Sequence, residues 1–95
     1  MQNLNDYYYF VQVVKYQGYT KASEALGITK SKLSRRITEL ETRLGVRLIQ
    51  RNTRKFTVTE IGQQFYLHCL KILEEVSETE KLCAQYVERP TLWPD

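Results

Sequence analysis

Apolar side chains recur at helical spacing along the first part of the chain. A stripe at positions 4, 7, 10, 11 and 14 predicts a helix that begins near Leu4 and stops at Gly18. A short second helix is predicted from Lys21 to Leu26, with Thr20 as its N-cap and Gly27 as the turn after it.

The next apolar stripe predicts a third helix, which begins after the capping residue Thr29 and ends at Gly45. Its apolar positions follow one another at i, i+4, i+7 and i+11: Leu33, Ile37, Leu40 and Leu44. Ile28, in the turn before this helix, is expected to fill the core. Two helices joined by a tight glycine turn form a helix-turn-helix.

After Gly45 the pattern changes to one typical of short strands. Residues 46–51 and 56–58 are rich in β-branched and other apolar side chains, and they flank the polar segment 52–55. We expect a small β-hairpin, the wing of a winged helix-turn-helix. The predicted fold is therefore mainly α, with three helices and the hairpin, followed by a long C-terminal helix.

This last helix is predicted to begin after Thr59 and to run to about Val87 without a proline. It would be about 42 Å long at 1.5 Å per residue, longer than the preceding domain is wide, so part of it needs another partner. A heptad-like seam is expected at a dimer interface: Phe65, Cys69, Ile72, Val76, Cys83 and Tyr86. A second stripe lies beside it: Tyr66, Leu70, Leu73 and Val87.

The pattern divides the chain into three parts. Residues 1–58 are expected to form the winged helix-turn-helix, and residues 59–88 the linker or dimerisation helix. Residues 89–95, which contain two prolines, are typical of a tail or the start of a hinge.

Charge is distributed unevenly between these parts. Residues 1–58 contain eleven basic and four acidic side chains, whereas residues 59–95 contain three basic and seven acidic ones. Over residues 28–55 alone the net charge is +7, which a mixed solvated surface rarely gives. A polyanion such as nucleic acid is the expected partner of the front half.

The outward side of the third helix has the composition of a surface that reads DNA. Opposite its apolar stripe lie short polar or cationic side chains, and the N-terminal part of such a helix meets base edges in the major groove. Cations at the tip of the hairpin suit the phosphate backbone or the minor groove. The residues predicted to bind DNA are Thr29, Lys30, Ser31, Lys32, Ser34, Arg35, Arg51, Thr53, Arg54 and Lys55.

Other classes of function lack the residues they need. An enzyme is not expected, because the single histidine, His68, has no partner arrangement for catalysis, and no cofactor is indicated. His68, Cys69 and Cys83 do not have the spacing of zinc ligands. No signal layout or membrane-spanning run is present, so a cytoplasmic location is expected.

Residues 4–88 resemble the N-terminal domain and linker helix of LysR-type bacterial transcription regulators. The similarity lies in the run from Thr29 to Ile49, which contains Leu-Ser-Arg, Leu-Glu and Leu-Gly-Val-Arg-Leu, and in Val-Thr-Glu-Ile-Gly at residues 58–62. Residues 9–14 and 20–26 also match. The family commonly has glutamine and proline where this chain has Lys30 and Ser31.

This resemblance implies a sequence-specific DNA-binding domain that acts as a homodimer through the linker helix, with higher oligomers in a full-length form. It places the positions of Lys30, Ser31, Ser34 and Arg35 in the major groove and residues 51–54 in the wing. The family's C-terminal effector-binding domain is absent from this chain, so we expect either an excised fragment, which we favour, or a naturally short form.

Two alternative functions stay open at this point. The domain could bind a protein or pair with another regulator through its long helix. A DNA-binding domain, by contrast, should lose duplex binding on Arg35→Ala and still dimerise. Attachment to a membrane surface through the basic face is the third hypothesis, although that face lacks bulky apolar anchors.

Overall fold

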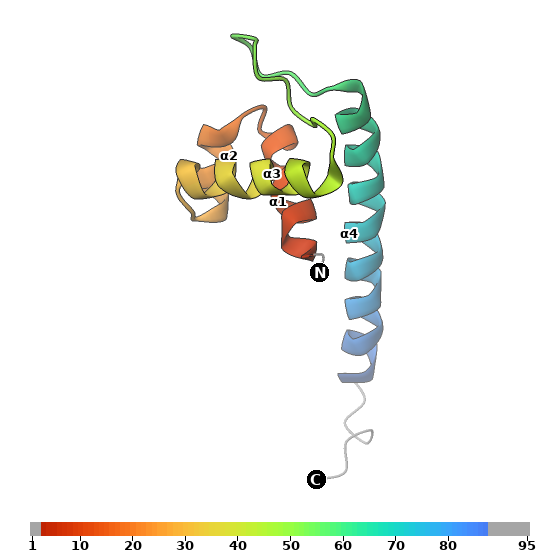
Figure 1. Ribbon diagram of the computed structural model, residues 1–95. Helices are drawn as coiled ribbons and strands as arrows, with labels where there is room; N and C mark the ends of the chain where they lie inside the picture. Colours follow the sequence, from red (N-terminus) through yellow and green to blue (C-terminus); the bar gives the residue numbers. More distant parts are fainter. Residues whose placement is uncertain (1–2, 88–95) are drawn as a thin grey trace.

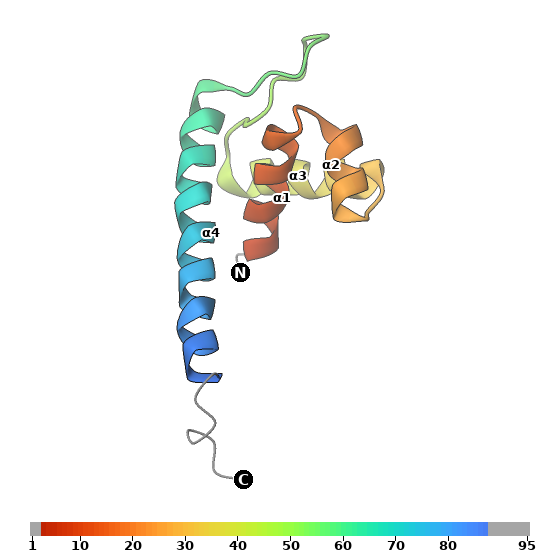
Figure 2. The ribbon, with the colours of Figure 1, turned by 180° about the vertical axis from the view of Figure 1, so that it is seen from behind.

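The computed structural model describes residues 3–87, and this part of the chain contains four helices. They are α1 (Leu4–Lys15), α2 (Tyr19–Leu26), α3 (Lys30–Leu44) and α4 (Glu60–Val87). Helices α1, α2 and α3 all pack on one another, whereas α4 contacts only α1 among the helices. Figures 1 and 2 show α4 running along one side of the three-helix group and continuing well past it.

The predicted turns and caps of α3 are confirmed. Thr29 accepts a hydrogen bond from the Lys32 amide (3.1 Å) through its side-chain oxygen. Gly27 and Gly45 have φ values of 71° and 76°, the left-handed conformation that glycine adopts without strain. The tight turn between α2 and α3 therefore forms the helix-turn-helix that the sequence predicts.

The predicted start of the second helix is wrong. Helix α2 begins at Tyr19, and Thr20 lies inside it, where its carbonyl oxygen accepts a hydrogen bond from the Ser23 hydroxyl (2.8 Å). The N-cap is Gly18, which makes no side-chain cap bond. The helix begins early because the chain reverses at Gln17 and Gly18, both with positive φ, before it reaches the threonine.

The core forms where the apolar stripes of α1 and α3 meet. Its largest fully buried side chains are Phe10, Val13, Leu33, Ile37, Leu40, Leu48 and Cys69. The Phe65 ring of α4 packs edge-on against Phe10 and Tyr7, with ring centroids 5.4 and 5.7 Å apart. These contacts hold the first half of α4 against α1. Leu44, at the end of the predicted apolar stripe of α3, is only half-buried at the edge of the core.

The β-hairpin predicted between residues 46 and 58 is not confirmed, because no strand forms within residues 3–87. The two runs meet at a single antiparallel bridge between Ile49 and Val58. Two backbone bonds flank this bridge, from the Gln50 amide to the Thr57 carbonyl and from the Thr59 amide to the Leu48 carbonyl, both 2.9 Å. Beyond the bridge the chain forms a projecting loop (Figure 1).

Thr59 caps α4, as the sequence predicts, and also ties the helix to the loop. Its hydroxyl oxygen accepts a hydrogen bond from the Gly62 amide (3.0 Å) and donates to the Arg47 carbonyl (2.7 Å). The first turn of α4 lies so close to the loop that a Cβ atom at Gly62 would overlap the Leu48 carbonyl oxygen and crowd Val58. Glycine is therefore required at this position by space, since its φ is not positive.

None of the four helices described here is long and apolar enough to cross a membrane.

Replacing Gly62 by alanine should destabilise the protein, although alanine favours a helix by about 1 kcal/mol. The added methyl group meets a backbone carbonyl that cannot rotate away, and overpacking of this kind costs about 1–3 kcal/mol. We expect a lower free energy of unfolding for Gly62→Ala in urea denaturation. Gln63→Ala, at the next and exposed position, is the control, and a Gly62→Ala protein more stable than wild type would contradict the close packing.

Candidate nucleic-acid interface

The first turns of α3 present a polar and cationic surface. Lys30, Ser31, Lys32 and Arg35 are exposed and Ser34 is half-buried, so four of these five residues predicted to bind DNA lie open to solvent. They reach this side because Leu33 and Ile37, on the opposite side of α3, are completely buried. The structure thus brings together the α3 residues that the sequence predicts as DNA-binding.

The nine basic side chains of residues 28–55 fall into two groups. Four of them form ion pairs with two acids: Asp6 with Arg36 (2.8 Å) and Arg43 (3.7 Å), and Glu41 with Arg47 (3.5 Å) and Arg51. The other five form no ion pair with an acid of residues 3–87: Lys30, Lys32, Arg35, Arg54 and Lys55. All five belong to the predicted DNA-binding set.

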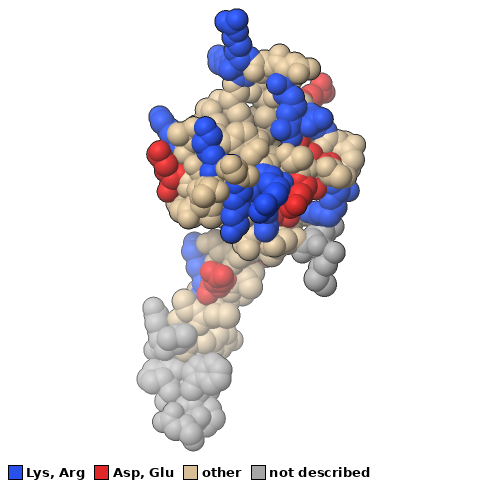
Figure 3. All heavy atoms as spheres, turned by 60° about the vertical axis from the view of Figure 1, so that its left-hand side comes forward, with Lys and Arg blue, Asp and Glu red and all other residues tan. Residues whose placement is uncertain are grey.

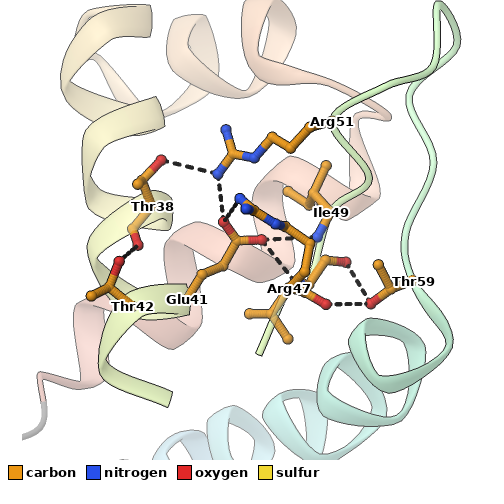
Figure 4. Close-up of polar contacts among 8 residues, drawn as sticks. Thr38, Glu41, Thr42, Arg47, Ile49, Arg51 and Thr59 are labelled. Carbon is orange, nitrogen blue, oxygen red and sulfur yellow. Dashed lines mark hydrogen bonds and ion pairs between the residues drawn. The ribbon is translucent and has the colours of Figure 1, made fainter. Parts of the chain in front are cut away.

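The buried carboxylate of Glu41 joins α3 to the loop (Figure 4). Its side chain is only 5% exposed, and its Oε2 atom accepts hydrogen bonds from the Leu48 amide (2.7 Å) and the Ile49 amide (3.0 Å). Its Oε1 atom accepts a hydrogen bond from Arg51, whose guanidinium also donates to the Thr38 hydroxyl (3.1 Å). Arg51, predicted as one of the cations at the tip of the wing, is held against α3 by these contacts.

The tip of the loop keeps its charges exposed. Arg54 and Lys55 are exposed, and the Thr53 hydroxyl donates a hydrogen bond to the Lys55 carbonyl (2.6 Å), which tightens the turn. Figure 3 shows lysine and arginine side chains gathered over the helical group and on the projection above it, with few acidic side chains among them. The long helix below shows few basic groups on this face.

Tyr19, at the start of α2, lies beside this surface. Its ring borders a hollow of about 450 Å³ together with Lys30, Ser31, Ser34 and Arg35. Burial raises the pKa of its phenol above the ordinary value of 10.0, Arg51 acts in the opposite direction, and Glu41 raises it further. The phenol is therefore protonated and neutral near pH 7.

Sequence reasoning missed Glu41 as a site residue, because Glu41 lies beyond the N-terminal part of α3 that is expected to meet the base edges. One signal could have found it. Glu41 lies four residues after Ile37, so it falls beside the buried apolar stripe and not opposite it. A carboxylate in that position needs hydrogen-bond donors within the protein.

The predicted dimer seam is divided by the structure. Cys69 is 1% exposed and lies in the core of its own chain, where burial raises the pKa of its thiol to about 11, so its place in the seam is wrong. Phe65 packs on that core as well. The other four seam residues, Ile72, Val76, Cys83 and Tyr86, are exposed or half-buried and lie farther along α4.

The second predicted stripe of α4 supplies part of the contact with the core. Tyr66 and Leu73 are half-buried against it, and Leu70 is exposed. The side chain of Val87 and the predicted tail, residues 89–95, lie outside the described residues. Within residues 3–87 no group of three or more histidine, cysteine or acidic side chains is placed to hold a metal ion.

Comparisons with known proteins agree on one family. The family described as bacterial regulatory helix-turn-helix protein, lysR family, matches residues 4–63. An HTH-type transcriptional regulator of Xanthomonas campestris pv. campestris (strain 8004) is 41% identical over 91 residues, which are 96% of this chain and 26% of that protein. The regulator BenM of Acinetobacter baylyi is 41% identical over 70 residues, 74% of this chain and 23% of BenM.

The fold has a close counterpart among solved structures. A complex of the BenM DNA-binding domain with catB site 1 DNA has a TM-score of 0.87 and 34% sequence identity. The similarity covers 92% of this chain and 94% of that one. Against the curated relatives, by contrast, this chain spans about a quarter of their length.

Replacing Glu41 by glutamine should loosen the attachment of the loop to α3. The amide has one acceptor oxygen in place of two and turns either an oxygen or an NH₂ group toward Arg51, so a charge-assisted bond worth about 1.5–3 kcal/mol is weakened. We expect a free energy of unfolding lower by about 2 kcal/mol in urea denaturation.

Glu39→Gln removes the same charge from an exposed position two residues earlier on α3 and is the matched control. Equal unfolding free energies for the two variants would show that the Glu41 contacts do not hold the loop.

Proposed function

The chain belongs to the lysR family of bacterial regulatory helix-turn-helix proteins, and from this premise we propose that it binds double-stranded DNA sequence-specifically as part of a bacterial transcription regulator. One observation supports the proposal above the others. The five cations without an acidic partner in residues 3–87 are those at the start of α3 and at the loop tip, where a bound duplex would supply phosphates.

We assign the base contacts to the first two turns of α3. The major groove accepts one helix, and the N-terminal residues of a recognition helix meet the base edges there. Arg35 can make a forked contact with guanine, while Ser31 and Ser34 are short donors and acceptors that suit any base. Thr29 and the first amides of α3 suit a phosphate.

The loop acts as the wing in this proposal, even though its two runs meet at one bridge only. Arg54 and Lys55 at its tip are exposed and suit the backbone or the narrower minor groove. Arg51, which Glu41 and Thr38 hold against α3, fixes the base of the loop and contributes less to the contact with phosphate.

We further propose that residues 1–58 are the DNA-binding domain and that residues 59–88 form a dimerisation helix. Beyond its contact with α1, α4 presents an apolar groove lined by Ile72, Val76 and Thr79 and edged by Glu75 and Glu80. Farther along α4, the apolar side chains of Leu82 and Tyr86 are also open to solvent, at 59% and 56% exposure. The same helix of a second copy would cover this surface and place two recognition helices on one duplex.

Removing a base reader and removing a backbone contact should have different effects on DNA binding. Arg35→Ala should weaken the binding free energy for the preferred duplex by about 1–3 kcal/mol and relax the sequence preference at one base pair. The preferred duplex is obtained by selection from a random pool. Arg54→Ala should weaken binding to all sequences and lower the slope of log K against log salt by about one. Fluorescence anisotropy over a range of salt concentrations measures both.

Arg43→Ala is the control, because it removes the same charge from a side chain that faces Asp6, and its salt slope should match that of wild type. If Arg35→Ala left duplex binding intact, the base-reading assignment would be wrong, and a protein-interaction module would explain the basic face better.

Introducing a charge into the apolar surface of α4 should separate the two copies. Val76→Glu places a carboxylate in the groove, and an unpaired charge buried in an interface is strongly unfavourable. We expect analytical ultracentrifugation to give the mass of one chain for this variant and of two chains for wild type. Ser77→Glu adds the same charge on a neighbouring, exposed side of α4, and dissociation by both variants would contradict the proposed face.

A further inference from the structure

The hydroxyl of Tyr19 is buried without a hydrogen-bond partner. Its oxygen is the buried side-chain polar atom of residues 3–87 for which no partner is found within the protein. The ring itself packs against the core, a role that phenylalanine would fill equally well. An unbonded buried hydroxyl destabilises the free protein, so the extra oxygen needs an explanation outside the folding of this domain.

The hollow beside this tyrosine carries two cations. Tyr19 lines it together with Lys30, Ser31, Ser34 and Arg35, and both Arg51 and Glu41 lie close enough to shift the phenol's pKa, in opposite directions. Lys30 and Arg35 are exposed and form no ion pair within residues 3–87. A ligand drawn into this hollow is therefore an anion, toward which a hydroxyl acts as donor.

Resting on the proposed function, we propose that the Tyr19 hydroxyl donates a hydrogen bond to a phosphate oxygen of the bound duplex. A backbone contact fits its position better than a base contact. Tyr19 opens α2, the first helix of the helix-turn-helix, and this helix crosses the DNA backbone while the second enters the groove.

In this proposal a phosphate reaches the hydroxyl when Lys30 and Arg35, long exposed side chains that line the same hollow, turn toward the duplex. Because burial and Glu41 raise the phenol's pKa despite Arg51, the donor proton is present throughout the neutral pH range. The contact adds affinity for any sequence and selects none.

The test is Tyr19→Phe, measured for both DNA binding and stability. Affinity should fall roughly tenfold, as the loss of a hydrogen bond to a charged acceptor predicts. The loss should be equal for a duplex selected from a random pool and for a scrambled duplex of the same length. The salt slope should stay unchanged because no charge is lost, and the melting temperature should equal or exceed that of wild type.

Tyr66→Phe removes a hydroxyl from a half-buried tyrosine on α4 and should leave DNA binding unchanged. The proposal is overturned by unchanged affinity of Tyr19→Phe, by a loss confined to the selected duplex, which indicates a base contact, or by a lowered melting temperature, which indicates a structural hydroxyl. Failure of the wild-type protein to bind either duplex would refute the proposed function itself and is distinguishable from all three.

Discussion

The carboxylate of Glu41 is the group on which the proposed DNA-binding surface depends. It accepts hydrogen bonds from two amides of the loop and pairs with two arginines, so it satisfies four donors from residues 47–51 at one point on α3. The loop forms only one backbone bridge of its own. The position of the loop relative to α3 is therefore set by the buried carboxylate of Glu41. A buried charge is costly to leave unpaired, so the loop must keep its donors in place around it.

The same principle decides which cations are available to a ligand. Asp6 and Glu41 each hold two arginines, and these pairs lie beside the core or at the base of the loop. The net charge of residues 28–55 is thereby concentrated at the N-terminal end of α3 and at the loop tip. The summed charge of the sequence indicates that the partner is negatively charged. Where the partner binds depends on Asp6 and Glu41, because they pair with four of the arginines and leave the other cations of residues 28–55 unpaired within residues 3–87.

The helices and their order could be predicted because apolar spacing and glycine turns are local signals. The start of α2 could not, since it depends on how Gln17 and Gly18 turn the chain before Thr20. The sequence predicts a hairpin where the structure has a single bridge, because β-branched residues indicate an extended backbone but not how many hydrogen bonds the two runs form with each other. Glu41 and the inward position of Cys69 depend on contacts between distant segments, which periodicity alone does not give.

Leu48 connects the proposed DNA-binding surface with the helix proposed to join two copies. Its amide donates to Glu41 of α3, and its carbonyl accepts a hydrogen bond from the Thr59 amide at the start of α4 (2.9 Å). The side chain of Leu48 is completely buried, and Gly62 packs against its carbonyl oxygen. Leu48 is therefore held by both α3 and α4 at the base of the loop. A rotation of α4 relative to the three-helix group must strain these bonds, so in the proposed dimer the spacing of the two DNA-binding surfaces would be set together with the position of each loop.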